Sequence, residues 1–279
     1  MTRLATAVAT CALVACGAEE LDEPEEPDDL EELEELNGGG KADGAEWISV
    51  GNGVVYQRVN AGDGVLVAYG GYSARLTYSA TWATEIVDAK LGAADVGHIY
   101  AVKGPAQASY AGREIGNSKL RAHLATIDAG APIFVVGHSS GSFVAHELLA
   151  QLHATGNTDV LSRISYANLD GGASGLTQSI AAELGGLAFV YANDPTLARG
   201  LSQNSGSAMA LGMAYRAHGV TFEVTIPDTG CVSGAGWCMH DVVITHRPHN
   251  ASSYDLARDY TDFVDRPVTT EYLDLFVAD

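Results

Sequence analysis

Short runs of apolar, largely β-branched residues alternate with longer helical patterns from Glu46 to the end of the chain. Such alternation predicts a mostly parallel β-sheet with helices on both faces, because parallel strands need long crossover connections. Strands are expected at residues 47–50, 54–60, 64–69, 98–102, 132–136, 163–169, 187–192 and 220–226. Helices are expected at residues 78–91, 117–129, 142–153 and 207–218. The sequence therefore predicts an α/β domain over residues 47–279.

The first 16 residues have the order of a secretory signal. Arg3 supplies a basic start, residues 4–15 are apolar or small, and Leu13-Val14-Ala15-Cys16-Gly17 follows. This order resembles the bacterial lipobox, in which the cysteine thiol receives a diacylglycerol. We therefore expect an exported protein that is held at a membrane by a lipid on Cys16, in the periplasm or on the cell surface. The alternative is a plain signal peptide that contains two cysteines, Cys11 and Cys16.

Residues 17–46, the acidic tether, hold 14 acidic residues and one basic residue. Like-charge repulsion and little apolar surface predict an extended, disordered segment. The formal charge of the whole chain is −20, which argues against a nucleic-acid partner and against electrostatic docking to anionic lipid. Membrane contact is therefore expected through the lipid anchor only.

One motif points to chemistry. Gly137-His138-Ser139-Ser140-Gly141 lies directly between the expected strand 132–136 and the expected helix 142–153. A G-x-S-x-G sequence in this position predicts a nucleophile elbow, which exposes the serine on a tight turn at a helix N-terminus. Ser139 is then the candidate nucleophile. The backbone N–H of Ser140 is a candidate donor to the oxyanion of the reaction.

With this motif and the order of its elements, the chain resembles the α/β-hydrolase superfamily, and within it the lipases and esterases, over about residues 50–265. The resemblance implies a second oxyanion donor in the loop after the third strand, where this chain has Gly70-Gly71-Tyr72-Ser73. The candidates are the Tyr72 and Gly71 N–H groups, although the HGGG form of that loop is absent. The segments after the elbow are short, so no large lid domain is expected.

The family order of serine, acid and histidine implies a base after the last strand. His240 fits this place best, with His249 and His246 as alternatives. For the acid, Asp170 is preferred to Asp194. The Leu-Asp context of Asp170 is similar to that of pancreatic-type lipases, which also have a Cys-x-His sequence at the base, as Cys238-Met239-His240 does here. Asp194 ends the following strand, the commoner family position.

Cys231 and Cys238 enclose six residues just before His240. Because an exported protein meets an oxidising compartment, we predict a disulfide that fixes this segment. A zinc site would need more ligands than two cysteines and one histidine provide. No dinucleotide or phosphate-loop signature occurs, so no metal and no cofactor are expected.

These observations predict a monomeric serine hydrolase that cleaves carboxylic esters, acting on an ester or lipid substrate. A thioesterase, peptidase or acyltransferase would use the same three residues. A non-catalytic binding lipoprotein on a hydrolase fold is a further alternative, as is a structural surface lipoprotein in which the acidic tether carries the function.

Overall fold

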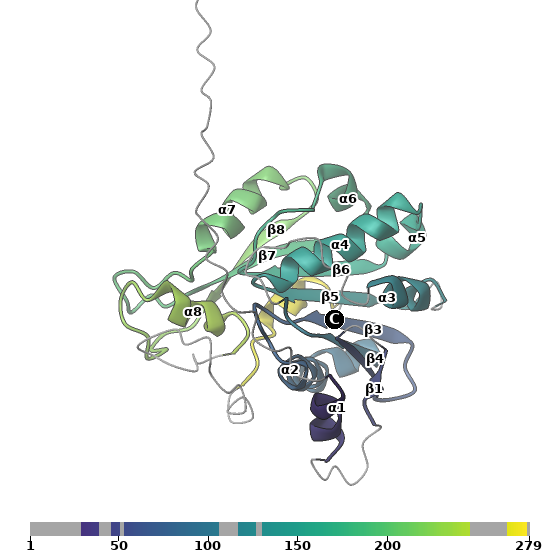
Figure 1. The fold of residues 1–279 in the computed structure, drawn as a ribbon. Coiled ribbons are helices and arrows are strands. Elements are labelled where there is room, and N and C mark those ends of the chain that lie inside the picture. The colour runs from purple at the N-terminus through teal and green to yellow at the C-terminus, as the bar shows by residue number, and fades with distance from the viewer. Residues whose placement is uncertain are drawn as a thin grey trace, which may run out of the picture.

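An eight-stranded sheet forms the centre of the computed structural model, which describes residues 29–38, 46–50, 53–105, 117–126, 130–245 and 267–277 (Figure 1). The strand order is β1-β2-β4-β3-β5-β6-β7-β8. The strands are β1 (Ile48–Ser49), β2 (Val54–Arg58), β3 (Gly64–Tyr69), β4 (Val96–Val102), β5 (Ile133–His138), β6 (Ile164–Leu169), β7 (Gly186–Asn193) and β8 (Val220–Thr225). All eight strands expected from the sequence are present.

The pairing of the strands is parallel from β4 to β8 and antiparallel only at one end. β1 pairs with β2 and β2 with β4 in antiparallel register, and every other neighbouring pair is parallel. The carboxyl ends of β3, β5, β6 and β7 therefore meet along one edge of the sheet. In open parallel sheets this is the edge at which ligands bind.

Helices cover both faces of the sheet (Figure 1). One face packs against α2 (Leu76–Ala89), η1 (Leu91–Ala94), α8 (Gly236–Val242) and η3 (Glu271–Leu275). The other face packs against α3 (Asn117–Leu124), α4 (Gly141–Ala154), α5 (Thr158–Leu161), α6 (Gln178–Glu183) and α7 (Ser205–Ala214). The predicted fold class is confirmed, and the topology is consistent with an α/β-hydrolase fold.

The four expected helices correspond to α2, α3, α4 and α7. α3 ends at Leu124, five residues earlier than expected, and α7 runs from Ser205 to Ala214. α6 and α8 were not expected from the sequence. The connections after β6 and β7 each hold one short helix. Residues 106–116 and 246–266 lie outside the described part of the chain, so the expectation of no large lid stays a prediction.

The core consists of two apolar layers separated by the sheet. β5 contributes to both layers, since Phe134 and Val136 face the α2 side while Ile133 and Val135 face the α4 side. All six residues of β5 are buried. A strand that is buried on both faces has a continuous run of apolar residues, which explains why β5 was recognisable in the sequence.

The prediction that the acidic tether is extended and disordered is wrong for Asp29–Gly38, which forms a helix, α1 (Figure 1). Leu33 and Leu36 lie one turn apart and pack against the core on the α2 side. The side chain of Glu32 is buried rather than solvated. Helical spacing of the leucines thus gives this stretch an apolar face in spite of its charge. The remaining tether residues up to 28, the signal segment and Cys16 lie outside the described residues.

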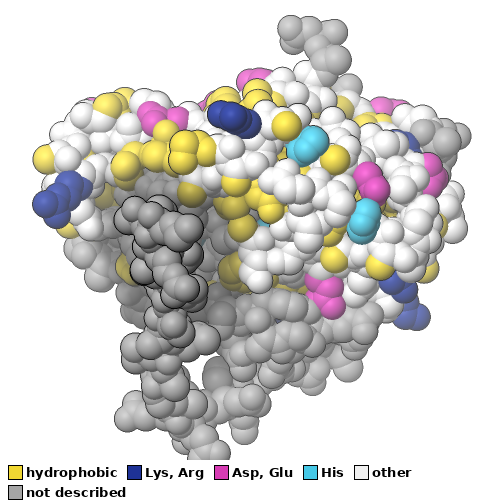
Figure 2. All heavy atoms as spheres, turned by 90° about the horizontal axis from the view of Figure 1, so that it is seen from above, with side chains coloured by type: hydrophobic (Ala, Val, Ile, Leu, Met, Phe, Trp, Pro, Cys, Tyr) yellow, Lys and Arg dark blue, Asp and Glu magenta, His cyan; other side chains and the backbone are white. Residues whose placement is uncertain are grey.

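Apolar side chains also remain on the surface. Met209 and Met213 are one turn apart on α7, and Val220 begins the edge strand β8; all three are exposed. Figure 2 views the molecule from the side of α6 and α7 and shows hydrophobic side chains gathered in patches there. Within the described residues, no helix is long and apolar enough to cross a membrane.

His146 on α4 is a buried histidine whose hydrogen bonds require the neutral ring. Its Nδ1–H donates to the Ser174 carbonyl at 2.8 Å, and its Nε2 accepts from the Tyr166 hydroxyl at 2.9 Å. Burial lowers the pKa of His146 from 6.5 to about 4, against the raising effect of the bond to Ser174. The unfolded chain therefore binds one more proton than the folded chain between pH 6.5 and pH 4.

We expect this histidine to make stability fall as pH falls. From pH 7 to pH 4.5 it should lower the free energy of unfolding by about 2 kcal/mol. Urea unfolding of the wild type and of His146→Gln at both pH values measures this, with the exposed His218→Gln as control for the substitution. If His146→Gln loses as much stability on acidification as the wild type, His146 is not the responsible group.

Candidate active site

The residues singled out in the sequence meet at the carboxyl edge of the sheet. β5 ends at His138 and is followed by Ser139, and β6 ends at Leu169 and is followed by Asp170. The loop after β3 holds Gly71. His240 comes from α8, which follows the last strand. The fold thus collects groups from four separate segments of the chain.

Ser139 occupies a strained turn between β5 and α4. Its φ angle is 53°, in the left-handed region that non-glycine residues rarely adopt. Both glycines of the motif are needed for this turn. A Cβ atom on Gly141 would lie 2.2 Å from the Gly70 carbonyl oxygen, and one on Gly137 would lie 2.9 Å from the Ser142 Cα. The geometry is that of a nucleophile elbow.

The structure brings Asp170 and His240 together. The distance from Asp170 Oδ2 to His240 Nδ1 is 2.5 Å, and both side chains are almost fully buried. Asp170 is itself held in place: its Oδ1 accepts from the Ser202 hydroxyl at 2.7 Å, and its Oδ2 accepts from the Asn204 N–H at 3.1 Å. The side-chain amide of Asn204 also donates to the backbone carbonyl of Asp170. A carboxylate fixed in this way sets the orientation of the imidazole.

The second ring nitrogen of His240, Nε2, does not contact Asp170. His240 Nε2 is buried and has no hydrogen-bond partner among the described residues. A buried polar atom without a partner is unusual, and a catalytic role is one of the accepted reasons for it. The ring is packed by His138 at a centroid distance of 4.5 Å and by the edge of Trp237 at 5.4 Å.

His138 links the elbow to His240. Its ring packs against that of His240 at an interplanar angle of 35°, and its Nε2–H donates to the His240 carbonyl at 3.3 Å. Burial, reinforced by the nearby His240, holds the pKa of His138 well below its usual value, so the ring is neutral near pH 7. Among the described contacts, no direct hydrogen bond joins Ser139 and His240; the ring of His138, next to Ser139 in the chain, contacts the His240 ring.

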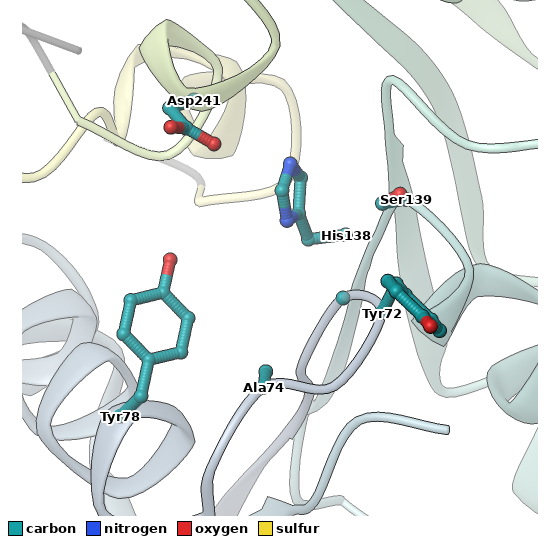
Figure 3. Close-up of a pocket in the computed structure, with 7 residues that line it drawn as sticks. Tyr72, Ala74, Tyr78, His138, Ser139 and Asp241 are labelled. Atoms are coloured by element: carbon teal, nitrogen blue, oxygen red, sulfur yellow. The ribbon is translucent and has the colours of Figure 1, made fainter. Parts of the chain in front are cut away.

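A small pocket opens over the elbow, lined by Gly71, Tyr72, Ala74, Tyr78, His138, Ser139 and Asp241 (Figure 3). In Figure 3 the ring of His138 lies between Asp241 and Ser139, and Tyr78 points from α2 toward the same space. Ser139 is partly exposed, whereas its neighbours on both sides are buried. The pocket therefore reaches the candidate nucleophile.

The candidate oxyanion donors surround the same pocket. A Cβ atom on Gly71 would lie 3.3 Å from the Ser139 Cβ, so this backbone passes close to the elbow. Within the described residues, the N–H groups of Gly71, Tyr72 and Ser140 donate to no acceptor. These three N–H groups therefore stay the candidate oxyanion donors.

The alternative acid, Asp194, has another role in the structure. It is buried and accepts four hydrogen bonds, two each from the N–H and hydroxyl groups of Thr196 and Thr229. Burial by itself would raise the pKa of Asp194, but these bonds outweigh it and lower the pKa to about 2. In the described part of the chain, the carboxylate of Asp194 accepts hydrogen bonds only from threonine groups of two loops. His246 and His249 lie outside the described residues.

The predicted disulfide is present. Cys231 and Cys238 are bonded, with their Cα atoms 5.9 Å apart. The bridge ties the loop after β8 to α8, two residues before His240. In the described part of the chain, no group of three or more His, Cys, Asp and Glu side chains is placed to hold a metal ion.

Some residues of the site were missed in the sequence. His138 lies at a variable position of the elbow motif, and such a position gives no indication of a contact with His240. Ser202 and Asn204 hold Asp170 from a loop 32 and 34 residues away, and nothing in their local sequence indicates that contact.

Comparison with known proteins gives only distant likeness. No protein-family model matches the chain, and no curated protein matches its sequence. Among solved structures, esterase Est22 has a TM-score of 0.44 at 14% identity, over 77% of this chain and 80% of that one. Carboxyl esterase 2 of the fungus Tuber melanosporum has a TM-score of 0.44 at 10% identity, over 71% and 80%. TT1662 from Thermus thermophilus has a TM-score of 0.43 at 14% identity, over 65% and 89%.

The contacts of Asp194 predict a stabilising role. Asp194→Ala leaves the buried Thr229 N–H and the Thr196 N–H without acceptors, and should lower the free energy of unfolding by about 3 kcal/mol. Because the pKa of Asp194 lies below its usual 3.8, this contribution is present above that pH and is lost toward pH 2. Urea unfolding at pH 7 measures the change, with the exposed Asp159→Ala as the matched control. Equal stability of the two variants would contradict the assignment.

Proposed function

We propose that the protein is a serine hydrolase that cleaves carboxylic esters through an acyl-enzyme on Ser139. One observation carries the proposal: the imidazole of His240 contacts His138 of the elbow and is fixed by Asp170 at one nitrogen, while its other nitrogen is buried and has no partner among the described residues. A serine hydroxyl needs a base of this kind, since it is a weak nucleophile by itself.

In the proposed reaction, Ser139 Oγ attacks the ester carbonyl carbon as His240 Nε2 takes its proton. The carbonyl oxygen becomes an oxyanion, and the N–H groups of Ser140 and of Gly71 or Tyr72 stabilise it. The imidazolium is stabilised by the Asp170 carboxylate. It then returns the proton to the leaving alcohol, and the ester bond breaks to leave an acyl group on Ser139.

Deacylation repeats these steps with water. His240 takes a proton from the water molecule as its oxygen attacks the acyl carbon, and the proton passes to Ser139 Oγ as the acid leaves. No metal or cofactor enters any step.

The shape of the site favours a small or loosely held acyl group. The pocket over Ser139 is bounded by the short loop 71–74 and by Tyr78. Trp237 is 45% exposed beside His240 and offers an apolar surface for part of the ester. We therefore expect short esters, or ester groups of a polymer, to react faster than long-chain esters.

Hydrolysis of p-nitrophenyl butyrate and palmitate tests the proposal. Ser139→Ala should lower kcat/KM by at least about 10³-fold, and Asp170→Asn by about 10²- to 10⁴-fold. Butyrate should react faster than palmitate. A fluorophosphonate should label the wild type at Ser139, as peptide mass spectrometry would show. Ser207→Ala, which changes an exposed serine on α7, is the matched control.

Two outcomes would contradict the proposal. Equal rates for the wild type and Ser139→Ala would remove Ser139 as the nucleophile. Folded wild-type protein that neither turns over an ester nor reacts with the fluorophosphonate would favour the non-catalytic binding lipoprotein.

We further propose that the protein is exported and anchored by a lipid on Cys16. The support is the order of Arg3, the apolar run and Leu13-Val14-Ala15-Cys16. Two or more acyl chains on one cysteine give stable membrane attachment, because each buried CH₂ contributes about 0.8 kcal/mol.

Cell fractionation after expression in a bacterium tests this anchor. Cys16→Ser should move the protein from the membrane fraction to the soluble fraction, while Cys11→Ser should leave it in the membrane fraction. Soluble, exported wild-type protein with an unmodified Cys16 would support the plain signal peptide instead.

A further inference from the structure

The N-terminus of α2 is capped by a residue from a distant part of the chain. The residue at the cap position, Arg75, makes no capping bond with its side chain, and the first turn of α2 holds no acidic residue. Instead, Glu32 Oε2 on α1 accepts from the Leu76 N–H at 2.5 Å and the Thr77 N–H at 3.3 Å. Free N–H groups at a helix start favour a negative charge, and Glu32 supplies it there.

Further contacts hold α1 in this position. Arg75 forms ion pairs with Glu35 at 2.7 Å and with Glu32 at 3.8 Å. The Asn37 side chain donates to the Trp47 carbonyl and accepts from the Trp47 N–H, both at 3.0 Å. Leu33 and Leu36 pack on the core below α2. Hydrogen bonds and ion pairs therefore hold α1 in addition to apolar packing. Figure 1 shows α1 directly beside α2.

The start of α2 is also the end of the loop that borders the pocket. Residues 70–75 connect β3 to α2, and Gly71, Tyr72 and Ala74 of this loop line the pocket together with Tyr78 of α2. The middle of the loop is fixed by hydrogen bonds from the Ser73 N–H to the Pro105 carbonyl and from the Gly104 N–H to the Ala74 carbonyl. Its C-terminal end is fixed where it joins α2, because Glu32 binds the N–H groups of Leu76 and Thr77.

We propose that α1 is a clip that positions the loop 70–75, and that Glu32 is its positioning residue. By binding the first N–H groups of α2, Glu32 fixes the place where this loop joins the helix. The N–H groups of Gly71 and Tyr72 then keep the direction that oxyanion binding needs, since such donors act only when they are held in advance. This inference rests on the proposed ester hydrolysis, and it gives part of the acidic tether a role in that reaction.

Kinetics of full-length Glu32→Ala, Glu32→Gln and Glu34→Ala test the proposal. Glu34 is the matched control, because it is an exposed glutamate on the same helix. Glu32→Ala should lower kcat by about 10-fold or more, with KM within about twofold, because a displaced oxyanion donor weakens binding of the transition state only. Glu32→Gln keeps an acceptor oxygen without the charge, so its kcat should lie between those of Glu32→Ala and the wild type. Glu34→Ala should match the wild type.

Amide hydrogen exchange gives a readout that needs no enzyme activity. In Glu32→Ala, peptides that cover residues 70–77 should exchange faster than in the wild type, while peptides from β5 should not change. All variants are measured well below their unfolding temperatures, so a lower Tm alone does not move either readout. If Glu32→Ala fails to fold, the same two readouts are taken on Glu32→Gln.

The failure of this inference is distinct from failure of the proposed function. Unchanged kcat and unchanged exchange in the Glu32 variants, with Ser139→Ala inactive, would overturn the proposal that α1 positions the loop 70–75. The proposed ester hydrolysis would stand. Faster exchange of residues 70–77 with unchanged kcat would also overturn it, because the loop would then move without consequence for the reaction. Equal hydrolysis by the wild type and Ser139→Ala would overturn both the esterase and the role given to the clip.

Discussion

The site depends on the close approach of two backbones, at Gly70 after β3 and at Gly141 at the start of α4. Even a single Cβ atom on Gly141 would overlap the Gly70 carbonyl oxygen. This approach sets the loop after β3 against the turn that holds Ser139, so the candidate nucleophile and the N–H groups of Gly71 and Tyr72 share one pocket. The positive φ of Ser139 is the strain that accompanies this arrangement.

A second constraint is the burial of Asp170 and His240. A carboxylate so far from water is tolerated only when hydrogen bonds replace its hydration, and Ser202 and Asn204 supply them. His240 is held in a comparable way, since α8 is tied to the preceding loop by the Cys231–Cys238 bridge. Both side chains are thus fixed by their neighbours. His240 Nε2 has no hydrogen-bond partner among the described residues, and in the reaction that we propose it accepts the proton of Ser139.

The sequence predicted what short-range patterns encode. The strand β5 and the elbow were recognisable because a fully buried strand is a continuous apolar run and the turn needs glycines at fixed positions. The pairing of Cys231 with Cys238 followed from their spacing and the expected compartment. The contacts of Ser202, Asn204 and His138 were not predicted, because they depend on how distant loops meet. α8 was missed because its short sequence, with Gly236 and a cysteine, carries no clear helical pattern.

The acidic tether shows why charge alone is an incomplete guide. Repulsion between its carboxylates predicts an extended chain, yet α1 forms because leucines at helical spacing and one glutamate meet complementary groups on α2. The N–H groups at the start of α2 and Arg75 are positive, so the charge that opposes an isolated α1 favours its docking. With the lipid that we propose on Cys16, docking of α1 leaves residues 17–28 between anchor and domain, which span at most about 40 Å. The same contact that positions the pocket loop would then also keep the start of α1 within that distance of the membrane.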